Sequence, residues 1–425
     1  MANVAAGMTQ SVARVEVPTA AERTFSGRRR LDGLTALRLL AALHVILFHL
    51  KVEGILSGGP WWYQNFAGIG YIGVNFFFVL SGFILVHTYA ANDLDPRRFW
   101  RARFARIYPA YVLSLAVTAP FFLFALRHLS LPFFAWSERH LEFAALLTLC
   151  LLQAWIPQGA LTWNPVCWSL SVEASFYALF PFLLRRIRAF SGRMLLFGIA
   201  AFSLISFSIS AVYILVHPDG AAKVNSSDIT LFWKNVLSFN PLVRLPEFIV
   251  GMMTGLLFLH TKSNPRLGSV CVLSGSAVIV LITALATTIP NPLISAGFLS
   301  PAFAAIILGV ALRPPWMRLF TLRPLVLLGE ASYSLYLLHS FVMTKAFEAT
   351  LGLPHGIRVA VCVVAAIGAS LVSYEFVEEP ARRFLRHKRR SEAAPHQSEM
   401  SKSVWLPCEL LIRPSVTKDV LSRPN

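Results

Sequence analysis

The sequence is poor in charged residues. Of its 425 residues, 14% are Asp, Glu, Lys or Arg and 56% are hydrophobic, whereas about a quarter of the residues in a typical soluble protein are charged. A soluble globule of this composition would expose much apolar surface to water, so we exclude that class, together with disordered, collagen-like and coiled-coil chains. The 33 phenylalanines and the recurring apolar runs of roughly 20 residues predict a polytopic membrane protein instead.

Cysteine, acidic residues and the motifs of soluble enzymes are also scarce. The five cysteines show no CxxC or other metal-ligand spacing, so we predict no metal site. The chain contains no G-x-S-x-G, HExxH, Walker A or GxGxxG motif. Lys and Arg number 38 against 21 Asp and Glu, which gives a net charge of +17. In a membrane protein this excess is typical of cytoplasmic loops, so we expect no nucleic-acid partner.

The apolar runs predict an all-α membrane domain over residues 31–386. Its expected spans, about ten, are 33–50, 69–91, 107–127, 168–187, 194–216, 241–260, 268–289, 296–312, 325–348 and 356–377. If the polar N-terminal tail 1–30, which ends in three arginines, is cytoplasmic, most Lys and Arg fall on that side. The positive-inside rule therefore predicts that both termini are cytoplasmic, including a flexible C-terminal tail at 387–425. The first span is expected to act as an uncleaved signal.

Residues 141–157 are apolar enough to cross the membrane but are not counted as a span. If they crossed, Arg185, Arg186 and Arg188 would lie on the outer side and break the charge pattern. We therefore predict one re-entrant or interfacial helix there, beside an outer vestibule.

Ionisable residues inside the spans are candidates for function, because a charge at mid-bilayer costs roughly 2.5–3.5 kcal/mol. Arg38 and His49 are eleven residues apart, about 1100° of helical rotation, so both project from one face, about 16 Å apart along the axis. That face would offer an elongated anionic ligand a cation near the inner side and a proton acceptor near the outer side. Alternatively, Arg38 reaches the inner headgroups and His49 simply ends the helix. His44 points elsewhere and is interpreted as structural.

Two further sites carry possible chemistry. Arg103 and Arg106 are spaced i, i+3, so they form one cationic helix face suited to phosphate oxygens, although they could also serve only as topology signals. Glu173, one turn inside the fourth span and four residues after Ser169, could orient or deprotonate an imidazole, or could simply favour the helix start.

Three other polar residues allow simpler interpretations. Arg244 and Glu247, also spaced i, i+3, are expected to neutralise each other near an outer helix start. His339 lies mid-span with tyrosines one and two turns before it, and could line a cavity or be a core histidine with satisfied hydrogen bonds.

Taken together, six segments between residues 31 and 386 resemble the acyltransferase 3 family of integral membrane acyltransferases. The segments are LDGL at 31–34 followed by Arg38-x10-His49, GVNFFFVLSGFIL at 73–85, Arg103-x-x-Arg106 leading into Ile107-Tyr108-Pro109, WSLSVEASFYALFP at 168–181, SYSLYLLH at 332–339 and YEFVEEPARRF at 374–384. Each segment alone is weak evidence for the family, but six segments in the same order along the chain are specific to it. Members of that family acylate bacterial surface glycans, lipopolysaccharide, nodulation factors and some macrolides.

The resemblance implies roles for particular residues. His49 looks like the catalytic histidine with Arg38 as its companion, and Arg103 and Arg106 look like part of the site for acyl-CoA phosphates. Glu173 matches the family's acidic residue, and Trp168 and His339 are candidates for substrate binding. The sequence departs from the family pattern in two places. Three extra residues separate the LDGL segment from Arg38. Ala174 stands where a second acid is common in the family, and this second departure weakens any role for a pair of carboxylates.

These roles predict transfer of an acyl group, most often acetyl, from cytoplasmic acyl-CoA to a hydroxyl of a cell-surface or exported glycan or glycolipid. His49 would act as general base and Glu173 as its orienter or polariser, in a multi-pass protein of the bacterial inner membrane. The outer position of His49 and the predicted vestibule favour an outer-face acceptor. Two alternatives are a multi-span transporter or exporter, against which we find no inverted repeat, and a catalytically silent scaffold or receptor.

Overall fold

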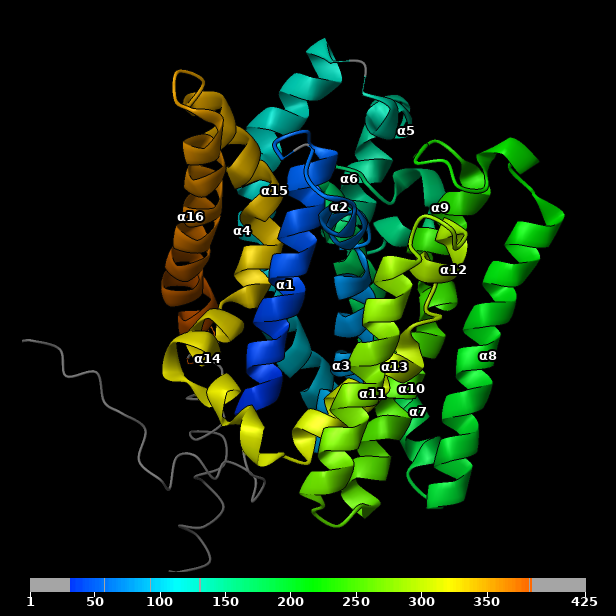
Figure 1. The fold of residues 1–425 in the computed structure, drawn as a ribbon. Helices are drawn as coiled ribbons and strands as arrows, with labels where there is room; N and C mark the ends of the chain where they lie inside the picture. Colours follow the sequence, from blue (N-terminus) through cyan, green and yellow to red (C-terminus); the bar gives the residue numbers. More distant parts are fainter. Residues whose placement is uncertain (1–30, 57, 92, 130, 382, 384–425) are drawn as a thin grey trace, which may run out of the picture. The chain divides into compact units, whose positions relative to one another are not determined.

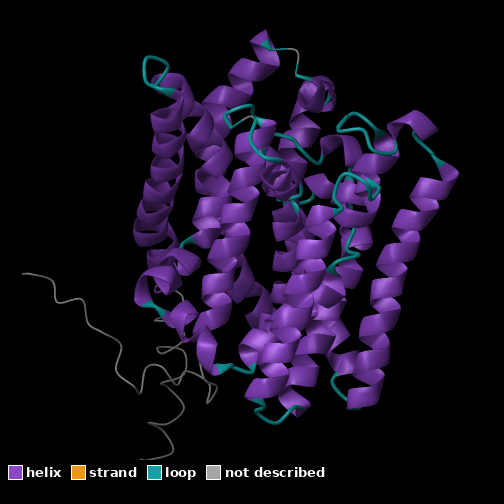
Figure 2. Cartoon of the chain, viewed as in Figure 1, coloured by secondary structure: helices purple, strands orange, loops and turns teal. Residues whose placement is uncertain are grey.

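The computed structural model describes residues 31–383 except 57, 92, 130 and 382. The first compact unit of the chain ends at Ala381. The two predicted tails, 1–30 and 387–425, lie outside the described residues. Within the described part, the regular structure is entirely helical and contains no strand (Figure 2). The prediction of an all-α chain is therefore confirmed.

The long helices form a multi-pass bundle (Figure 1). They are α1 (Asp32–Val52), α3 (Ile72–Tyr89), α4 (Pro96–His128), α7 (Trp168–Ile187), α8 (Gly192–Val216), α10 (Pro241–His260), α11 (Pro265–Ala284), α13 (Ser300–Ala311), α15 (Ser332–Ala349) and α16 (His355–Ser373). In the described residues, nine helical segments are long and apolar enough to span a membrane, or ten if the bent pair α14 (Arg323–Glu330) and α15 counts as one span. This number agrees with the prediction of about ten.

The ninth predicted span, 325–348, is not one straight helix. The chain bends by 67° between α14 and α15. A Cβ atom on Gly329 would lie 2.0 Å from the carbonyl oxygen of Thr35, so the absence of a side chain lets the end of α14 lie directly against α1. The hydroxyl of Ser332 donates to the Gly329 carbonyl at 2.8 Å. The apolar pattern predicts the span but does not indicate the close approach of Gly329 to Thr35.

The third predicted span begins earlier than expected. Helix α4 has 33 residues and starts at Pro96, where the carboxylate of Asp95 accepts a hydrogen bond from the Arg97 backbone N–H at 2.9 Å. The stretch 97–106, expected as a connection, is therefore the first part of a helix about 50 Å long. Arg103 and Arg106 lie on one helix, as their i, i+3 spacing predicted, and that helix continues into the span, which was not predicted.

The segment 141–157 contains no helix long enough to cross a bilayer. Helix α6 (Leu141–Leu149) has nine residues, which corresponds to about 13 Å, against a hydrocarbon core of about 30 Å. Leu151 then adopts a positive φ of 58°, and short 3₁₀ turns follow at Gln153–Trp155 and Pro157–Gly159. Its penetration into the bilayer remains a prediction.

Apart from α14, which lies against the beginning of α1, the short helices gather at the end of the bundle where α1 finishes (Figure 1). They are α2 (Trp61–Gly68), α5 (Ala135–Arg139), α6, α9 (Phe232–Phe239) and α12 (Asn291–Ser295). The opposite end, where α1 begins, also holds the first turns of α4 and α15 because successive long helices alternate in direction.

Glycines bring α3 and α10 into direct backbone contact. A Cβ atom on Gly251 of α10 would lie 1.9 Å from the carbonyl oxygen of Val79, and one on Gly82 of α3 would lie 2.2 Å from that of Phe248. Helices pack this closely in membranes mainly where small residues meet, because packing rather than the hydrophobic effect drives their association.

We expect Gly251→Ala to destabilise the bundle, because the added methyl group overlaps backbone atoms that cannot rotate away. Overpacking of this kind costs about 1–3 kcal/mol or more. Thermal unfolding in detergent should show a lower midpoint than for the wild type. Gly368→Ala is the matched control, since a Cβ atom there meets nothing within 4 Å. Equal midpoints for the two variants would contradict the packing argument.

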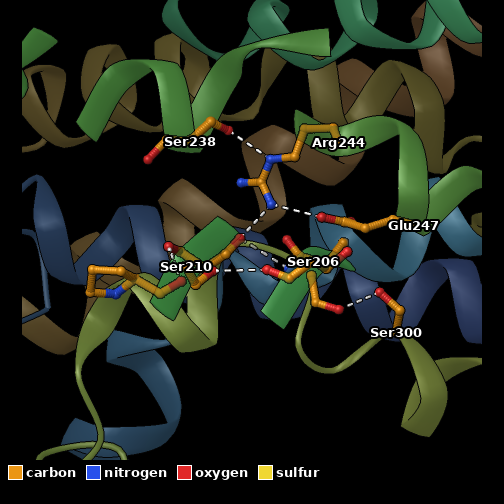
Figure 3. Close-up of polar contacts among 10 residues, drawn as sticks. Ser206, Ser210, Ser238, Arg244, Glu247 and Ser300 are labelled. Atoms are coloured by element: carbon orange, nitrogen blue, oxygen red, sulfur yellow. Dashed lines mark hydrogen bonds and ion pairs between the residues drawn. The ribbon is translucent and has the colours of Figure 1, made fainter. Parts of the chain in front are cut away.

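The start of α10 holds a buried ion pair (Figure 3). The Nη1 of Arg244 donates to Oε1 of Glu247 at 2.8 Å, and the two side chains are 4% and 0% exposed. The same guanidinium donates to the carbonyl oxygens of Ser238, at 2.8 Å, and Ser295. The predicted mutual neutralisation of Arg244 and Glu247 is therefore confirmed, and the pair also ties the α9–α10 junction to the end of α12.

Candidate active site

A cavity of about 260 Å³ lies among α1, α3, α4, α7 and α15, and it collects polar side chains from all five helices. Its polar lining residues are Thr35, Arg38, Ser81, Arg103, Arg106, Ser169, Glu173, Tyr177, Ser332, Tyr333 and Tyr336, and the remainder of the lining is apolar. Four residues proposed from the sequence, Arg38, Arg103, Arg106 and Glu173, therefore meet at one site, although they come from three different helices.

The three arginines give the cavity its cationic character. Arg103 donates from Nη2 to the Tyr89 hydroxyl at 3.0 Å, and its guanidinium carbon lies 5.4 Å from the centre of the Tyr89 ring and 5.9 Å from that of Tyr177. Its Nε is buried and has no hydrogen-bond partner among the described residues. A buried N–H without an acceptor, beside two further guanidinium groups, suits an anionic ligand with several oxygens.

Glu173 is the acid of this cavity. Its Oε1 accepts hydrogen bonds from the hydroxyls of Ser81, at 3.1 Å, and of Tyr177, one turn later on α7. The carboxylate also interacts electrostatically with Arg106. Ser169, the expected i, i+4 neighbour of Glu173, instead shares a hydrogen bond of 2.8 Å with the Tyr336 hydroxyl.

His49 lies outside the cavity, beside a different carboxylate. Its Nδ1 is 3.4 Å from Oε1 of Glu53, one turn later at the C-terminal end of α1. Its ring also meets the ring of His339 edge to face, with 4.8 Å between ring centres. The sequence argument expected Glu173 to orient this imidazole, but the carboxylate beside the ring is that of Glu53, whereas Glu173 lines the cavity. Arg38 and His49 lie on one helix, as expected, and Arg38 lines the cavity.

His339 and Tyr336 connect the two places. His339 is fully buried, and its Nδ1 lies 2.8 Å from the Tyr336 carbonyl oxygen. The Tyr336 side chain lines the cavity, its ring centre is 5.9 Å from that of His339, and its hydroxyl donates to the Val166 carbonyl at 2.9 Å. Tyr336 therefore forms part of the wall that separates the cavity from the histidine pair.

Two other residues singled out from the sequence have packing partners. Trp168 does not line the cavity, and its ring lies 6.0 Å from the Phe78 ring, 4.9 Å from the Phe239 ring and 5.8 Å from the Arg244 guanidinium. The Nε2 of His44 lies 2.8 Å from the Phe66 carbonyl oxygen, which joins α1 to α2 and fits the structural interpretation.

The family model described as an acyltransferase domain matches residues 31–374, which is most of the chain and includes all of the candidate site residues. The chain belongs to this acyltransferase family. It is therefore an enzyme, a multi-pass membrane acyltransferase, and the family leaves the transport and scaffold alternatives without support. The match also confirms the family resemblance inferred from the six segments.

Relatives with curated names agree. Over 389 residues the acyltransferase is 28% identical to "Acyltransferase MdmB" of Streptomyces mycarofaciens, covering 86% of this chain and 95% of that protein. It is 25% identical over 392 residues to "O-acetyltransferase OatA" of Staphylococcus aureus, covering 85% of this chain but 58% of OatA. It is 39% identical over 106 residues to "Protein 2 in picA locus" of Rhizobium radiobacter, covering 24% of this chain and 49% of that protein. No solved structure matches the acyltransferase.

Among the residues at the site that sequence reasoning missed, three contact a predicted site residue directly. Tyr177 and Glu53 stand four residues after Glu173 and His49, and this i, i+4 spacing could have identified both. Glu53 was passed over because it falls beyond the predicted end of the first span at residue 50. Ser81 stands in the 73–85 segment, but nothing local indicates that it contacts Glu173.

Proposed function

We propose that this acyltransferase moves an acyl group, most often acetyl, from cytoplasmic acyl-CoA to a hydroxyl of a cell-surface or exported glycan or glycolipid. The observation that carries the proposal is the convergence of Arg38, Arg103 and Arg106 on one cavity. Three guanidinium groups fit the phosphates of a CoA thioester, and the buried Nε of Arg103 provides a donor for one of their oxygens.

The size of the cavity suits part of the donor. Pockets that enclose a drug-sized ligand have volumes of about 300–1,000 Å³, and this cavity has about 260 Å³. We therefore assign it to a phosphate-bearing portion of acyl-CoA and the adjoining arm, with the thioester directed past Tyr336 toward His49.

In the proposed reaction, the acceptor hydroxyl attacks the thioester directly. The acceptor oxygen forms a bond to the acyl carbon, the carbon–sulfur bond breaks, and His49 takes the proton of the hydroxyl and passes it to the departing CoA thiolate. Glu173, bonded to Ser81 and Tyr177, keeps a carboxylate within the field of Arg106 and holds the cavity in shape. Cys167 does not line the cavity, which agrees with a route without a thiol nucleophile.

The distribution of charges supports one sidedness for the reaction. The end where α1 begins carries Arg97, Arg98 and Arg101 on the first turns of α4, so we assign it to the cytoplasm and place the protein in a bacterial inner membrane. The donor cavity with Arg38 lies toward that end, and His49 lies about 16 Å farther along α1. The acceptor then reaches His49 from the outer side. The name of OatA, an O-acetyltransferase, supports acetyl transfer to oxygen.

The test uses membranes from a strain that lacks the gene, with and without the gene restored. Given acetyl-CoA labelled with ¹³C in the acetyl group, membranes with the enzyme should yield glycans heavier by one labelled acetyl group in mass spectra. Membranes without it should yield none. Unlabelled glycans from both, with the protein present in the membrane, would contradict the assigned donor or acceptor.

A further inference from the structure

The carboxylate beside His49 is held in place by several groups. Oε1 of Glu53 lies 3.4 Å from Nδ1 of His49 and accepts a hydrogen bond from the Ser340 hydroxyl at 2.6 Å. Oε2 accepts one from the Thr344 hydroxyl at 2.9 Å. Ser340 and Thr344 stand one turn apart on α15, so Glu53 bridges the end of α1 to that helix. Neither oxygen of the carboxylate is left to turn freely.

This arrangement determines which nitrogen of His49 carries the proton. An ionised carboxylate can only accept hydrogen bonds, so the nitrogen facing Glu53 is the N–H nitrogen of the neutral ring. Nε2 then keeps its lone pair and is the nitrogen able to take a proton from a substrate hydroxyl. The distance of 3.4 Å is long, but such contacts are often long in a free enzyme and shorten when substrate binds.

We infer that Glu53 is the positioning residue of His49: it fixes the imidazole with its proton on Nδ1 and stabilises the imidazolium that forms during transfer. The inference rests on the proposed role of His49 as general base. Glu53 is not assigned to touch substrate, and it replaces Glu173 in the part that the sequence argument gave to that residue.

The charge state of Glu53 fits this role. Burial raises the pKa of its carboxyl, but the hydrogen bonds from His49, Ser340 and Thr344 and the positive charge of a protonated His49 outweigh burial and lower the pKa below its ordinary value. The side chain is 22% exposed, as is that of His49, so the pair is only partly shielded from solvent. Glu53 therefore stays ionised at neutral pH.

No other anion among the described residues competes for the imidazole. The second imidazole, that of His339, has its Nδ1 within hydrogen-bond distance of the Tyr336 carbonyl oxygen, at 2.8 Å. Of the nearby cations, Lys51 donates to the Gln64 carbonyl at 2.7 Å, and Lys345 pairs with Glu348 at 2.7 Å. Glu53 is thus the acid that contacts His49.

The experiment compares purified Glu53→Ala, Glu53→Gln and Glu53→Asp with the wild type, using acetyl-CoA and the acceptor found in the labelling test. Glu53→Ala should lower kcat by roughly tenfold to a hundredfold, less than the loss of the partner acid in a fully buried triad. KM for acetyl-CoA should stay unchanged, because the donor cavity lies elsewhere. Glu53→Asp should recover part of kcat. Glu348→Gln, which removes another carboxylate at the same end of the bundle, is the matched control and should keep full activity.

A second measurement does not need activity. In ¹⁵N spectra of histidine-labelled enzyme, the His49 signals, assigned by their loss in His49→Ala, should show the proton on Nδ1 in the wild type. In Glu53→Ala the proton should move partly or wholly to Nε2, and Glu53→Gln provides the same comparison if the alanine variant does not fold. Wild-type kcat and an unchanged tautomer in these variants would overturn the inference. If His49→Ala stayed active, the proposed role of His49 as general base, on which this inference rests, would fail.

Discussion

His49→Ala is expected to abolish measurable acyl transfer while the protein still inserts and folds. Positioned general bases contribute about 10²- to 10⁴-fold to rate, and no other imidazole in the described residues can replace this one. His339 is fully buried, with its ring packed between His49 and Tyr336. The loss should therefore fall on kcat, with the binding of acyl-CoA retained.

The control for this variant lies on the same helix. His44→Ala removes an imidazole whose Nε2 bonds the Phe66 carbonyl and which stacks on the Phe66 ring at 4.1 Å between ring centres. It should cost some stability at the α1–α2 contact but leave kcat near that of the wild type. Transfer of the labelled acetyl group, measured at matched protein levels, distinguishes the His49→Ala variant from the His44→Ala variant. Full activity in His49→Ala would remove His49 from the chemistry.

The second large effect is expected at the cavity that we propose for the acyl donor. Arg106→Ala should raise KM for acyl-CoA by about 10- to 100-fold, since a hydrogen bond to a charged group contributes about 1.5–3 kcal/mol and each 1.4 kcal/mol is a factor of ten. Arg103→Ala should act in the same direction. Lysine at either position should rescue little, because an ammonium cannot reproduce the planar fork of a guanidinium.

Arg101→Ala tests whether this effect belongs to the cavity or to charge in general. Arg101 stands on the same helix as Arg103 and Arg106, but it is exposed and does not line the cavity. Its removal lowers the local positive charge equally and should leave KM unchanged. Saturation curves for acetyl-CoA provide the measurement. An equal rise in KM for Arg101→Ala would show that the arginines act only through the field of a basic surface.

The helix pattern of this chain could be predicted from the sequence to a large extent. Helices α7 and α10 begin and end at the predicted residues, because a continuous apolar run and flanking polar residues report where each span begins and ends. The early start of α4 and the bend before α15 could not be predicted in this way. Both depend on contacts, the Asp95 cap and the approach of Gly329 to Thr35, that a hydropathy profile does not contain.

The candidate site, like the fold, could be predicted only in part from the sequence. Arg38, Arg103, Arg106 and Glu173 were candidates by spacing and by the cost of charge in a membrane, the family resemblance implied their roles, and the structure brings all four to one cavity. The carboxylate next to His49 was not identified. Which acid contacts an imidazole is decided by how far α1 continues past residue 50 and by where α15 presents Ser340 and Thr344. Both are properties of packing.

The wall at Tyr336 has a consequence for the energy balance of the cell. Ionisable groups spread along one face of α1 and across the bundle, from Arg38 to His49, could carry protons across the membrane if water joined them. The Tyr336 side chain lines the cavity and its ring centre lies 5.9 Å from that of His339. Its hydroxyl bonds to Ser169 and to the Val166 carbonyl, and its ring meets Phe77 in an edge-to-face contact. If the acyl group passes from one side of the membrane to the other, as we propose, the enzyme must still insulate the two compartments electrically. Tyr336, placed between the cavity lining and His339, is the residue that we propose for this barrier.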